Sequence, residues 1–316
     1  MSAAPPAPDI LCLGEPLLEF NRQPDDGGGR ALYLRGFGGD ASNAAIAAAR
    51  TGARVGMVGA VGADEAGDAF LRLWAEEGVD ARHVRRDPDA PTGLYFVEHG
   101  PEGHRFTFHR AGSAASRYRP DMVPAEAVRG ARLLYASGIS QGISASAADA
   151  VFHAIETARD SGVTVAYDTN LRLRLWPLAR ARAVIHAAIA LADIALPSRE
   201  DAEALTGLAD PRDIAARYLD LGPRMVALKC GRDGALLARR GAPMLALPAH
   251  PVAAVDATGA GDTFSGSFLA RLVLGDPPEA AFAYANAAAA LSTTGWGAVA
   301  PIPRPDAVRA LLQRLP

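Results

Sequence analysis

Short apolar runs that alternate with alanine-rich helical segments constrain the fold of this chain more than any other feature. The runs at residues 133–138 and 163–168 end in Gly or Asp, as buried strands of a parallel sheet often do. The segments at 145–159, 179–191 and 209–221 have the apolar periodicity of helices. This alternation predicts an α/β fold with a doubly wound, mostly parallel sheet, in which ligands bind at the carboxyl ends of the strands.

Two stretches of the chain interrupt this alternation. Residues 32–37 and 93–110 alternate apolar and polar side chains with the period of two that strands have, and residues 100–103 form a turn within the second stretch. They predict a small antiparallel sheet outside the main core. Such a sheet is suited to close over a substrate or to pair through its edges with a second copy of the chain, which predicts a homodimer.

Charge and composition argue against several classes of function. With 32 Lys plus Arg and 35 Asp plus Glu, the formal charge is -3, so we expect no polybasic surface for nucleic acid or membrane lipid. Cys12 and Cys230 lie in apolar runs that predict buried strands, which argues against a disulfide framework. Residues 1–8 lack the features of a signal peptide, and no apolar stretch reaches the roughly 18 residues of a membrane span. We expect a cytoplasmic protein with a small-molecule ligand.

The run from Asp256 to Asp262 carries the clearest chemical signal. Gly259 and Gly261 let the backbone approach a ligand, and the helical pattern that follows supplies unpaired N–H groups. The amides near Gly259, Ala260 and Gly261 therefore predict an anion hole. Asp262 beside it is suited to accept the proton of an attacking hydroxyl while the amides hold a phosphoryl group, which predicts phosphoryl transfer.

Other interpretations of this run are less specific. One alternative is that Asp262 only caps a helix after a glycine turn. A dinucleotide fingerprint is excluded because no third glycine follows Gly261 at the required spacing, and the chain has no P-loop pattern. An oxidoreductase of similar architecture is disfavoured for the same reason.

Residues 256–264 resemble the carboxy-terminal signature of the ribokinase-like, or PfkB, carbohydrate kinases. Residues 37–45 resemble the Gly-Gly motif near the amino terminus of that family, and the likeness covers nearly the whole chain. The resemblance implies a three-layer α/β sandwich with a mostly parallel central sheet and a small β-sheet lid. It also implies one kinase domain over residues 1–316, with the lid built from about 15–37 and 91–113.

The resemblance further implies a set of site residues. Those that contact the substrate are Gly39, Asp40, Asn43, Tyr95, Phe108, Arg110 and Arg172. Those that contact ATP are Ser198, Lys229, Gly231, Gly234, Thr258 and Asn286. Ser198 and Asp201 stand where the family has Asn-x-x-Glu, so Asp201 is expected to reach Mg²⁺ through water, since this ion keeps its hydration shell. Whether a monovalent cation such as K⁺ is needed near the anion hole stays open.

The segments around Arg110 and Arg172 are similar to those of 2-keto-3-deoxygluconate kinases, although Phe108 stands where those enzymes tend to have Tyr. Arginine binds a carboxylate as a two-pronged donor, which favours a sugar acid phosphorylated on its primary hydroxyl. If both arginines merely face solvent, the alternatives are a fructokinase, a ribokinase or a nucleoside kinase of the same family. A sensor of sugars or nucleotides that keeps the fold without catalysis is a further alternative.

Overall fold

The main sheet runs through the whole molecule. The computed structural model describes residues 7–24, 27–100 and 103–313. Within them the sheet order is β13-β12-β11-β10-β9-β8-β1-β4-β5, parallel from β11 to β5, with β12 and β13 antiparallel at one edge. The strands are β1 (Ile10–Leu13), β4 (Val55–Gly62), β5 (Val79–Asp87), β8 (Leu133–Ser137), β9 (Thr164–Asp168), β10 (Ile194–Ala195), β11 (Met225–Lys229), β12 (Ala235–Arg239) and β13 (Leu245–Leu247). The predicted α/β architecture is confirmed.

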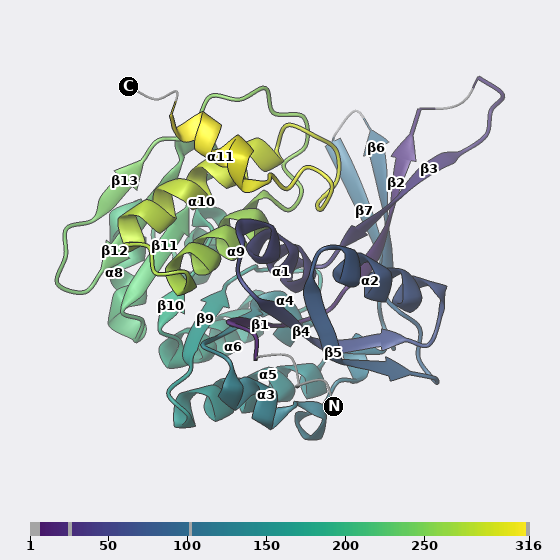
Figure 1. Cartoon of the computed structure of the whole chain (residues 1–316), viewed down its shortest axis with the longest axis horizontal. Helices are drawn as coiled ribbons and strands as arrows, with labels where there is room; N and C mark the ends of the chain where they lie inside the picture. The colour runs from purple at the N-terminus through teal and green to yellow at the C-terminus, as the bar shows by residue number, and fades with distance from the viewer. Residues whose placement is uncertain (1–6, 25–26, 101–102, 314–316) are drawn as a thin grey trace, which may run out of the picture.

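Helices cover both faces of this sheet (Figure 1). On one face lie α1 (Asp40–Thr51), α2 (Glu65–Glu76), α9 (Ala260–Val273) and α10 (Pro278–Ser292), with α11 (Pro305–Leu312) packed on α10. On the other lie α3 (Ala125–Gly130), α4 (Gly138–Gly142), α5 (Ala145–Asp160), α6 (Leu178–Leu191), α7 (Arg199–Thr206) and α8 (Pro211–Leu221). The predicted helix at 209–221 begins later than expected because the side chain of Asp210 caps it.

Two apolar cores fill the spaces between the sheet and its helix layers. Ile185 is fully buried in one and Phe268 in the other. In the second core α1 and α9 approach very closely, since a Cβ atom at Gly266 would lie 2.1 Å from the Ala44 carbonyl oxygen. This close packing brings the first turns of α1 and α9 together at the carboxyl ends of the parallel strands.

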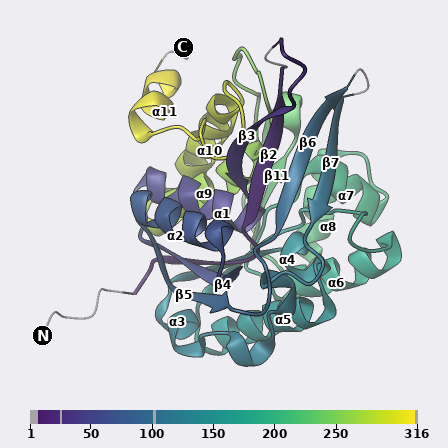
Figure 2. The same ribbon diagram turned by 90° about the vertical axis from the view of Figure 1, so that its right-hand side faces the viewer.

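A smaller sheet, the lid sheet, consists of β2 (Leu17–Gln23), β3 (Leu32–Gly38), β6 (Leu94–Gly100) and β7 (Gly103–His109) in the order β3-β2-β6-β7. In Figures 1 and 2 it projects from the body of the molecule. The hairpins β2–β3 and β6–β7 are antiparallel, but β2 and β6 pair in parallel. The expectation of a purely antiparallel sheet was therefore wrong, because side-chain alternation carries no information on strand direction. In the turn predicted at 100–103, residues 101–102 lie outside the described residues.

The remaining expectations concern cysteines and membrane spans. Cys12 is buried in β1, whereas Cys230 is half-buried just after β11, and both thiols are free. Among the described residues, no helix has both the length and the apolar character needed to cross a membrane.

Candidate active site

The helix α9 begins at a glycine turn that presents Asp262. Gly259 precedes the helix with a φ of 74°, and a Cβ atom there would lie 2.9 Å from the Ala298 carbonyl oxygen. Only glycine meets both conditions without strain. Asp262 lies inside the first turn, so it does not cap the helix.

The amides of this turn differ in their availability. The Ala260 N–H donates to the Ala257 carbonyl at 3.2 Å, whereas the N–H groups of Gly261 and Asp262 have no acceptor among the described residues. The first turn of a helix leaves such donors unpaired, and they attract anions. The free amides of this turn are therefore those of Gly261 and Asp262, whereas the Ala260 amide of the predicted set is already paired.

Asp256 holds the turn before α9 in place. Its carboxylate accepts hydrogen bonds from the Thr258 N–H at 2.9 Å, from the Thr258 hydroxyl at 2.7 Å and from the Gly297 N–H at 2.9 Å. The hydroxyl of Thr258, predicted to contact ATP, is thus committed to the turn. These bonds fix the backbone that leads into α9.

The pKa of the Asp262 carboxyl is raised toward neutrality. Burial, followed by the negative charge of Asp40, raises the pKa of Asp262 to about 7. A hydrogen bond from the Asn43 amide, at 2.8 Å, and the charge of Lys229 act in the opposite direction. A carboxyl group that titrates near neutral pH is well matched to accepting a proton from an alcohol under those conditions.

The first turn of α1 offers unsatisfied polar atoms beside Asp262. Gly39 precedes it with a φ of 96°, and a Cβ there would lie 2.2 Å from the Glu15 carbonyl oxygen. The Asp40 Oδ1 and Asn43 Oδ1 atoms are buried and have no hydrogen-bond partner among the described residues. Buried acceptors normally find donors, and sugar hydroxyls would supply them.

Asn170 was not predicted as a site residue. It follows β9 with a φ of 30°, the one positive φ outside glycine in the described residues. Its amide donates to Asp40 Oδ2 at 3.1 Å. Backbone strain of this kind concentrates at functional sites, although the sequence gives no sign of it because Asn is common in ordinary turns.

On the lid sheet, Tyr95 is buried and its hydroxyl donates to the Glu19 carboxylate. The Phe108 ring lies 5.4 Å from the Tyr95 ring and is 38% exposed. Arg110 stacks over Phe108 and forms an ion pair with the fully buried carboxylate of Glu15. The charge of Arg110 is therefore already balanced within the protein.

Arg172 differs from Arg110 in its surroundings. It is exposed, and its guanidinium donates to the Leu171 carbonyl at 2.8 Å. Burial raises the pKa of both Asp40 and Asp201, and the charge of Arg172 opposes that rise in each case. Arg172 thus lies near the site with its charge uncompensated by a direct ion pair in the described residues.

The expected nucleotide residues gather around the turn between β11 and β12. Gly234 has a φ of 93°, and a Cβ there would lie 2.0 Å from the Leu247 carbonyl oxygen, so the chain requires glycine. The Asn286 amide donates to the neighbouring Pro248 carbonyl at 2.8 Å. Gly231 begins the same turn with a φ of 58°. These contacts bring three of the predicted ATP residues to one region.

Ser198 and Asp201 belong to the start of α7. The Ser198 hydroxyl accepts the Asp201 N–H at 3.1 Å, so it caps the helix. The Asp201 carboxylate accepts from the Thr169 hydroxyl and the Leu171 N–H, both at 3.0 Å. Across the described ranges, no group of three or more His, Cys, Asp or Glu residues is arranged to hold a metal. A single half-buried carboxylate fits Mg²⁺ that keeps most of its water and phosphate ligands.

The ion pair between Asp168 and Lys229 was not predicted from the sequence, although Lys229 by itself was expected to contact ATP. Asp168 ends β9, Lys229 ends β11, and their side chains form an ion pair with Nζ and Oδ2 2.6 Å apart. The Ser265 hydroxyl of α9 donates to the same Asp168 oxygen at 2.8 Å. The terminal position of each residue on its strand was the available signal, but the sequence does not give the strand order that brings them together.

Known proteins are similar to this chain in both sequence and fold. The model of the pfkB family carbohydrate kinases matches residues 9–305. A 2-dehydro-3-deoxygluconokinase of Thermoproteus tenax is 34% identical, covering 97% of this chain and 94% of the relative. A 2-dehydro-3-deoxygalactonokinase of Haloferax volcanii is 32% identical, covering 96% of each. The crystal structure of a Xylella fastidiosa fructokinase with bound ATP has a TM-score of 0.87 at 27% identity, over 96% of this chain and 98% of that one.

Proposed function

Because the chain belongs to the pfkB family of carbohydrate kinases, we propose that it phosphorylates the primary hydroxyl of a 2-keto-3-deoxy sugar acid. It is an ATP-dependent sugar kinase, so the proposal concerns the acceptor and the residues that act on it. The leading acceptor is 2-keto-3-deoxygluconate, the compound also named 2-dehydro-3-deoxygluconate. The observation that carries the proposal is the partly buried carboxylate of Asp262 beside free helix amides.

In the proposed reaction, Asp262 takes the proton of the acceptor hydroxyl as its oxygen attacks the γ-phosphorus of ATP. The bond from that phosphorus to the bridging oxygen breaks, and ADP leaves. The N–H groups of Gly261 and Asp262 stabilise the charge on the phosphoryl oxygens during transfer. The amide of Asn43 orients the Asp262 carboxylate through its 2.8 Å hydrogen bond.

We assign the nucleotide to the region of Gly231, Gly234 and Asn286, next to the anion hole. Mg²⁺ bound to the phosphates would neutralise part of their charge, and Asp201 would reach it through water. The glycines let the backbone lie close to the nucleotide, and Lys229 adds a positive charge near its phosphates. A reaction that consumes ATP suits the cytoplasm. A requirement for a monovalent cation such as K⁺ stays a prediction, tested by exchanging K⁺ for tetramethylammonium in the assay.

The uncompensated charge of Arg172 supports a sugar acid as acceptor. We propose that its guanidinium binds the substrate carboxylate, while the unpaired oxygens of Asp40 and Asn43 accept hydrogen bonds from substrate hydroxyls. Tyr95 and Phe108 would cover the substrate from the lid sheet, with Gly39 allowing close approach. Arg110 contributes less charge, since Glu15 already neutralises it.

The ion pair between Arg110 and Glu15 favours a second candidate acceptor, fructose. A site in which Arg110 is paired with Glu15 offers less positive charge to a carboxylate than the sequence suggested. A neutral sugar needs hydroxyl partners only, and Asp40 and Asn43 provide acceptors for them. The fold likeness to an ATP-bound fructokinase agrees with this candidate.

One experiment tests the proposal: ADP release is measured with 2-keto-3-deoxygluconate, its galactose-derived epimer, fructose and ribose, for the wild type and for Asp262→Asn. We expect the highest kcat/KM with the sugar acids. We expect the variant to lose at least about 1000-fold in kcat, in line with loss of a general base and its charge. Near wild-type turnover by Asp262→Asn would show that another group is the base.

The choice between the two acceptors is tested by Arg172→Met. Loss of a charge-assisted bond worth about 1.5 to 3 kcal/mol lowers kcat/KM for a sugar acid by about 10- to 150-fold. Fructose turnover should change little. Arg180→Met, which removes another exposed arginine from α6, is the matched control. Equal losses for the acid and for fructose would contradict a carboxylate-binding role.

We also propose that the lid sheet forms a homodimer interface. Its edge strand β3 exposes Leu32 and Leu34, at 40% and 54%, together with Tyr33. Exposed apolar edge strands invite pairing with another chain. Light scattering should give twice the mass of the 32.8 kDa chain, and Leu34→Lys should reduce it toward that of one chain.

A further inference from the structure

A polar cluster of Asp168, Lys229 and Ser265 lies beneath the first turn of α9, and the reaction described so far gives a role only to the charge of Lys229 near the phosphates. Asp168 is 1% exposed at the end of β9, and Lys229 lies at the end of β11, with the short strand β10 between them. The lysine crosses over β10, and its Nζ atom lies 2.6 Å from Asp168 Oδ2. Its side chain is 13% exposed.

Ser265 connects this pair to α9. Its hydroxyl donates to Asp168 Oδ2 at 2.8 Å, and the Lys229 ammonium donates to its Oγ at 3.3 Å. A Cβ atom placed on Gly261 would lie 3.7 Å from Nζ and 3.8 Å from Cδ of the lysine. The ammonium therefore lies directly against the turn that carries the free amides and the base.

Stability alone gives a poor reason for such a pair. Burying two charges costs solvation free energy, and apolar residues of similar volume often stabilise a core as well or better. An ammonium has three N–H donors, and two of them are directed to Asp168 and Ser265. The charge is held at a fixed place rather than left free to follow a ligand.

The charges around Asp262 suggest what the fixed ammonium of Lys229 does. The groups that face Asp262 are Asp40 from α1, Asp168 from β9, Tyr95 from β6, Tyr135 from β8 and Lys229 from β11. Most of them are carboxylic acids or phenols, which disfavour a negative charge on Asp262 or leave it unchanged. Lys229 is the cation in this set, and ATP would bring more negative charge.

We propose that Lys229, fixed by Asp168 and Ser265, is a positioning residue that keeps a positive charge beneath the first turn of α9. There it holds the Asp262 carboxylate ready for proton transfer while the phosphoryl group is present. The inference rests on the proposed kinase reaction with Asp262 as base. It assigns to Lys229 a role toward the base, in addition to the nucleotide contact expected from the sequence.

The test is the pH dependence of kcat/KM for the acceptor that the wild type phosphorylates fastest. Lys229→Met should move the acid limb of the profile up by about one pH unit, which is about a tenfold loss at pH 6. Lys229→Arg keeps the charge, so its acid limb should stay near that of the wild type. Asp168→Asn removes a negative charge near the base but also releases the ammonium that Asp168 holds, so its limb should move up less than that of Lys229→Met.

Two further measurements keep the outcomes distinct. An unmoved limb in Lys229→Met, with a KM for ATP raised tenfold or more, would overturn the inference and leave a nucleotide contact. An acid limb in Lys229→Arg that moves as far as that of Lys229→Met would also overturn it. Near-ultraviolet circular dichroism checks that each variant folds. If Lys229→Met or Asp168→Asn does not fold, the acid limb of the remaining variant is compared with that of Lys229→Arg, and this comparison tests the inference. Failure of the proposed base appears separately, as activity in Asp262→Asn.

Discussion

At the scale of single residues, the proposed chemistry depends on Asp262, a carboxylate with a raised pKa. Asp262 lies among carboxyl groups that came together from α1, β9 and α9, and burial is the main cause of its raised pKa. A group whose pKa rises on folding destabilises the folded state once it ionises. The raised pKa that suits Asp262 to the proposed role of base therefore also lowers the stability of the folded protein when Asp262 is ionised.

Asp262→Asn should accordingly stabilise the protein at alkaline pH. The folded-state pKa is about 7 and exceeds the unfolded value, so the cost is absent below pH 4 and complete above pH 7. We expect the variant to gain about 1 to 3 kcal/mol at pH 8, after allowance for partial exposure, and less at pH 5. Urea unfolding at the two pH values measures this gain.

Asp306→Asn is the control for that comparison, because its side chain is 95% exposed. Its stability should match that of the wild type at both pH values. Asp262→Asn less stable than the wild type at pH 8 would contradict the charge balance described for the site.

The sequence pointed to some residues of the candidate site and not to others, for a definite reason. Asp262 and Gly259 lie within one short run, so local spacing was enough to single them out as candidates. Asn43 was inferred from a second local motif, and its bond to Asp262 joins residues 219 positions apart. The pairs Glu15–Arg110 and Asp168–Lys229 depend on which strands are neighbours, which local patterns do not encode.

At the scale of elements, the approach of α9 to α1 controls where the free amides of Gly261 and Asp262 lie. The contact uses Gly266, whose Cβ would lie 2.1 Å from the Ala44 carbonyl and 2.9 Å from the Ala47 side chain. Backbone atoms cannot move aside as a flexible side chain does. The helices must separate if a larger residue is introduced there.

Gly266→Ala should therefore lower stability by about 1 to 3 kcal/mol, the usual cost of overpacking, and should also reduce kcat. Gly130→Ala is the control, because its Cβ would meet the Ala7 side chain at an ordinary 3.5 Å. Thermal unfolding and ADP release are measured for both. If the two variants behave alike, the tight helix contact is not what positions α9.

Side-chain periodicity predicted the helices and strands but not every strand pairing. The strands and helices of the main sheet were expected from alternation of apolar runs, and the lid strands from their period of two. The parallel pairing of β2 with β6 was not expected, because it is set by the path of the chain through β4 and β5.

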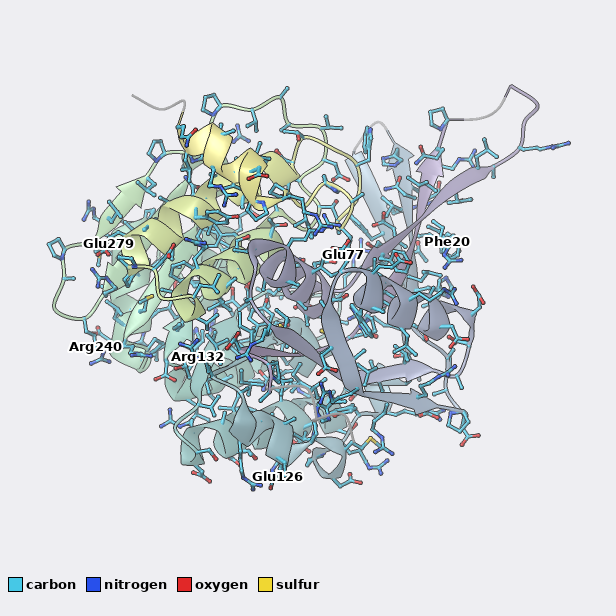
Figure 3. The ribbon with its side chains drawn as sticks, in the orientation of Figure 1. Phe20, Glu77, Glu126, Arg132, Arg240 and Glu279 are labelled. Atoms are coloured by element: carbon cyan, nitrogen blue, oxygen red, sulfur yellow. The ribbon has the colours of Figure 1, made fainter. Side chains whose placement is uncertain are left out.

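At the scale of the whole molecule, an ion-pair network ties the end of the chain to the helices of one face. The Arg50 guanidinium donates to Glu77 at 2.7 Å and to the Ile302 carbonyl at 2.6 Å, and Arg304 donates to Glu77 at 3.1 Å. Figure 3 labels Glu77 beside the C-terminal segment. Its hydrogen bond from Arg50 is the main reason that the pKa of Glu77 is lowered.

Glu77→Gln should cost about 2 to 4 kcal/mol of stability at pH 7, since Arg50 and Glu77 are only 9% and 10% exposed. A lowered pKa contributes stability above about pH 4.3 and loses it as pH falls through the folded-state value, so the difference should shrink in acid. Glu126→Gln, at a residue 91% exposed and also labelled in Figure 3, should change stability by less than about 0.5 kcal/mol. Equal effects of the two changes would rule out a stabilising network.

The parallel pair in the lid sheet also governs the order in which a growing chain can assemble. Glu19 of β2 and Tyr95 of β6 are 76 positions apart, so the hairpin β2–β3 leaves the ribosome well before its partner strand exists. Until then its inner edge has unpaired backbone groups, a state prone to wrong association. Nascent chains that stop before β6 should therefore be the species most dependent on chaperones, and the lid sheet is completed only after synthesis has passed His109.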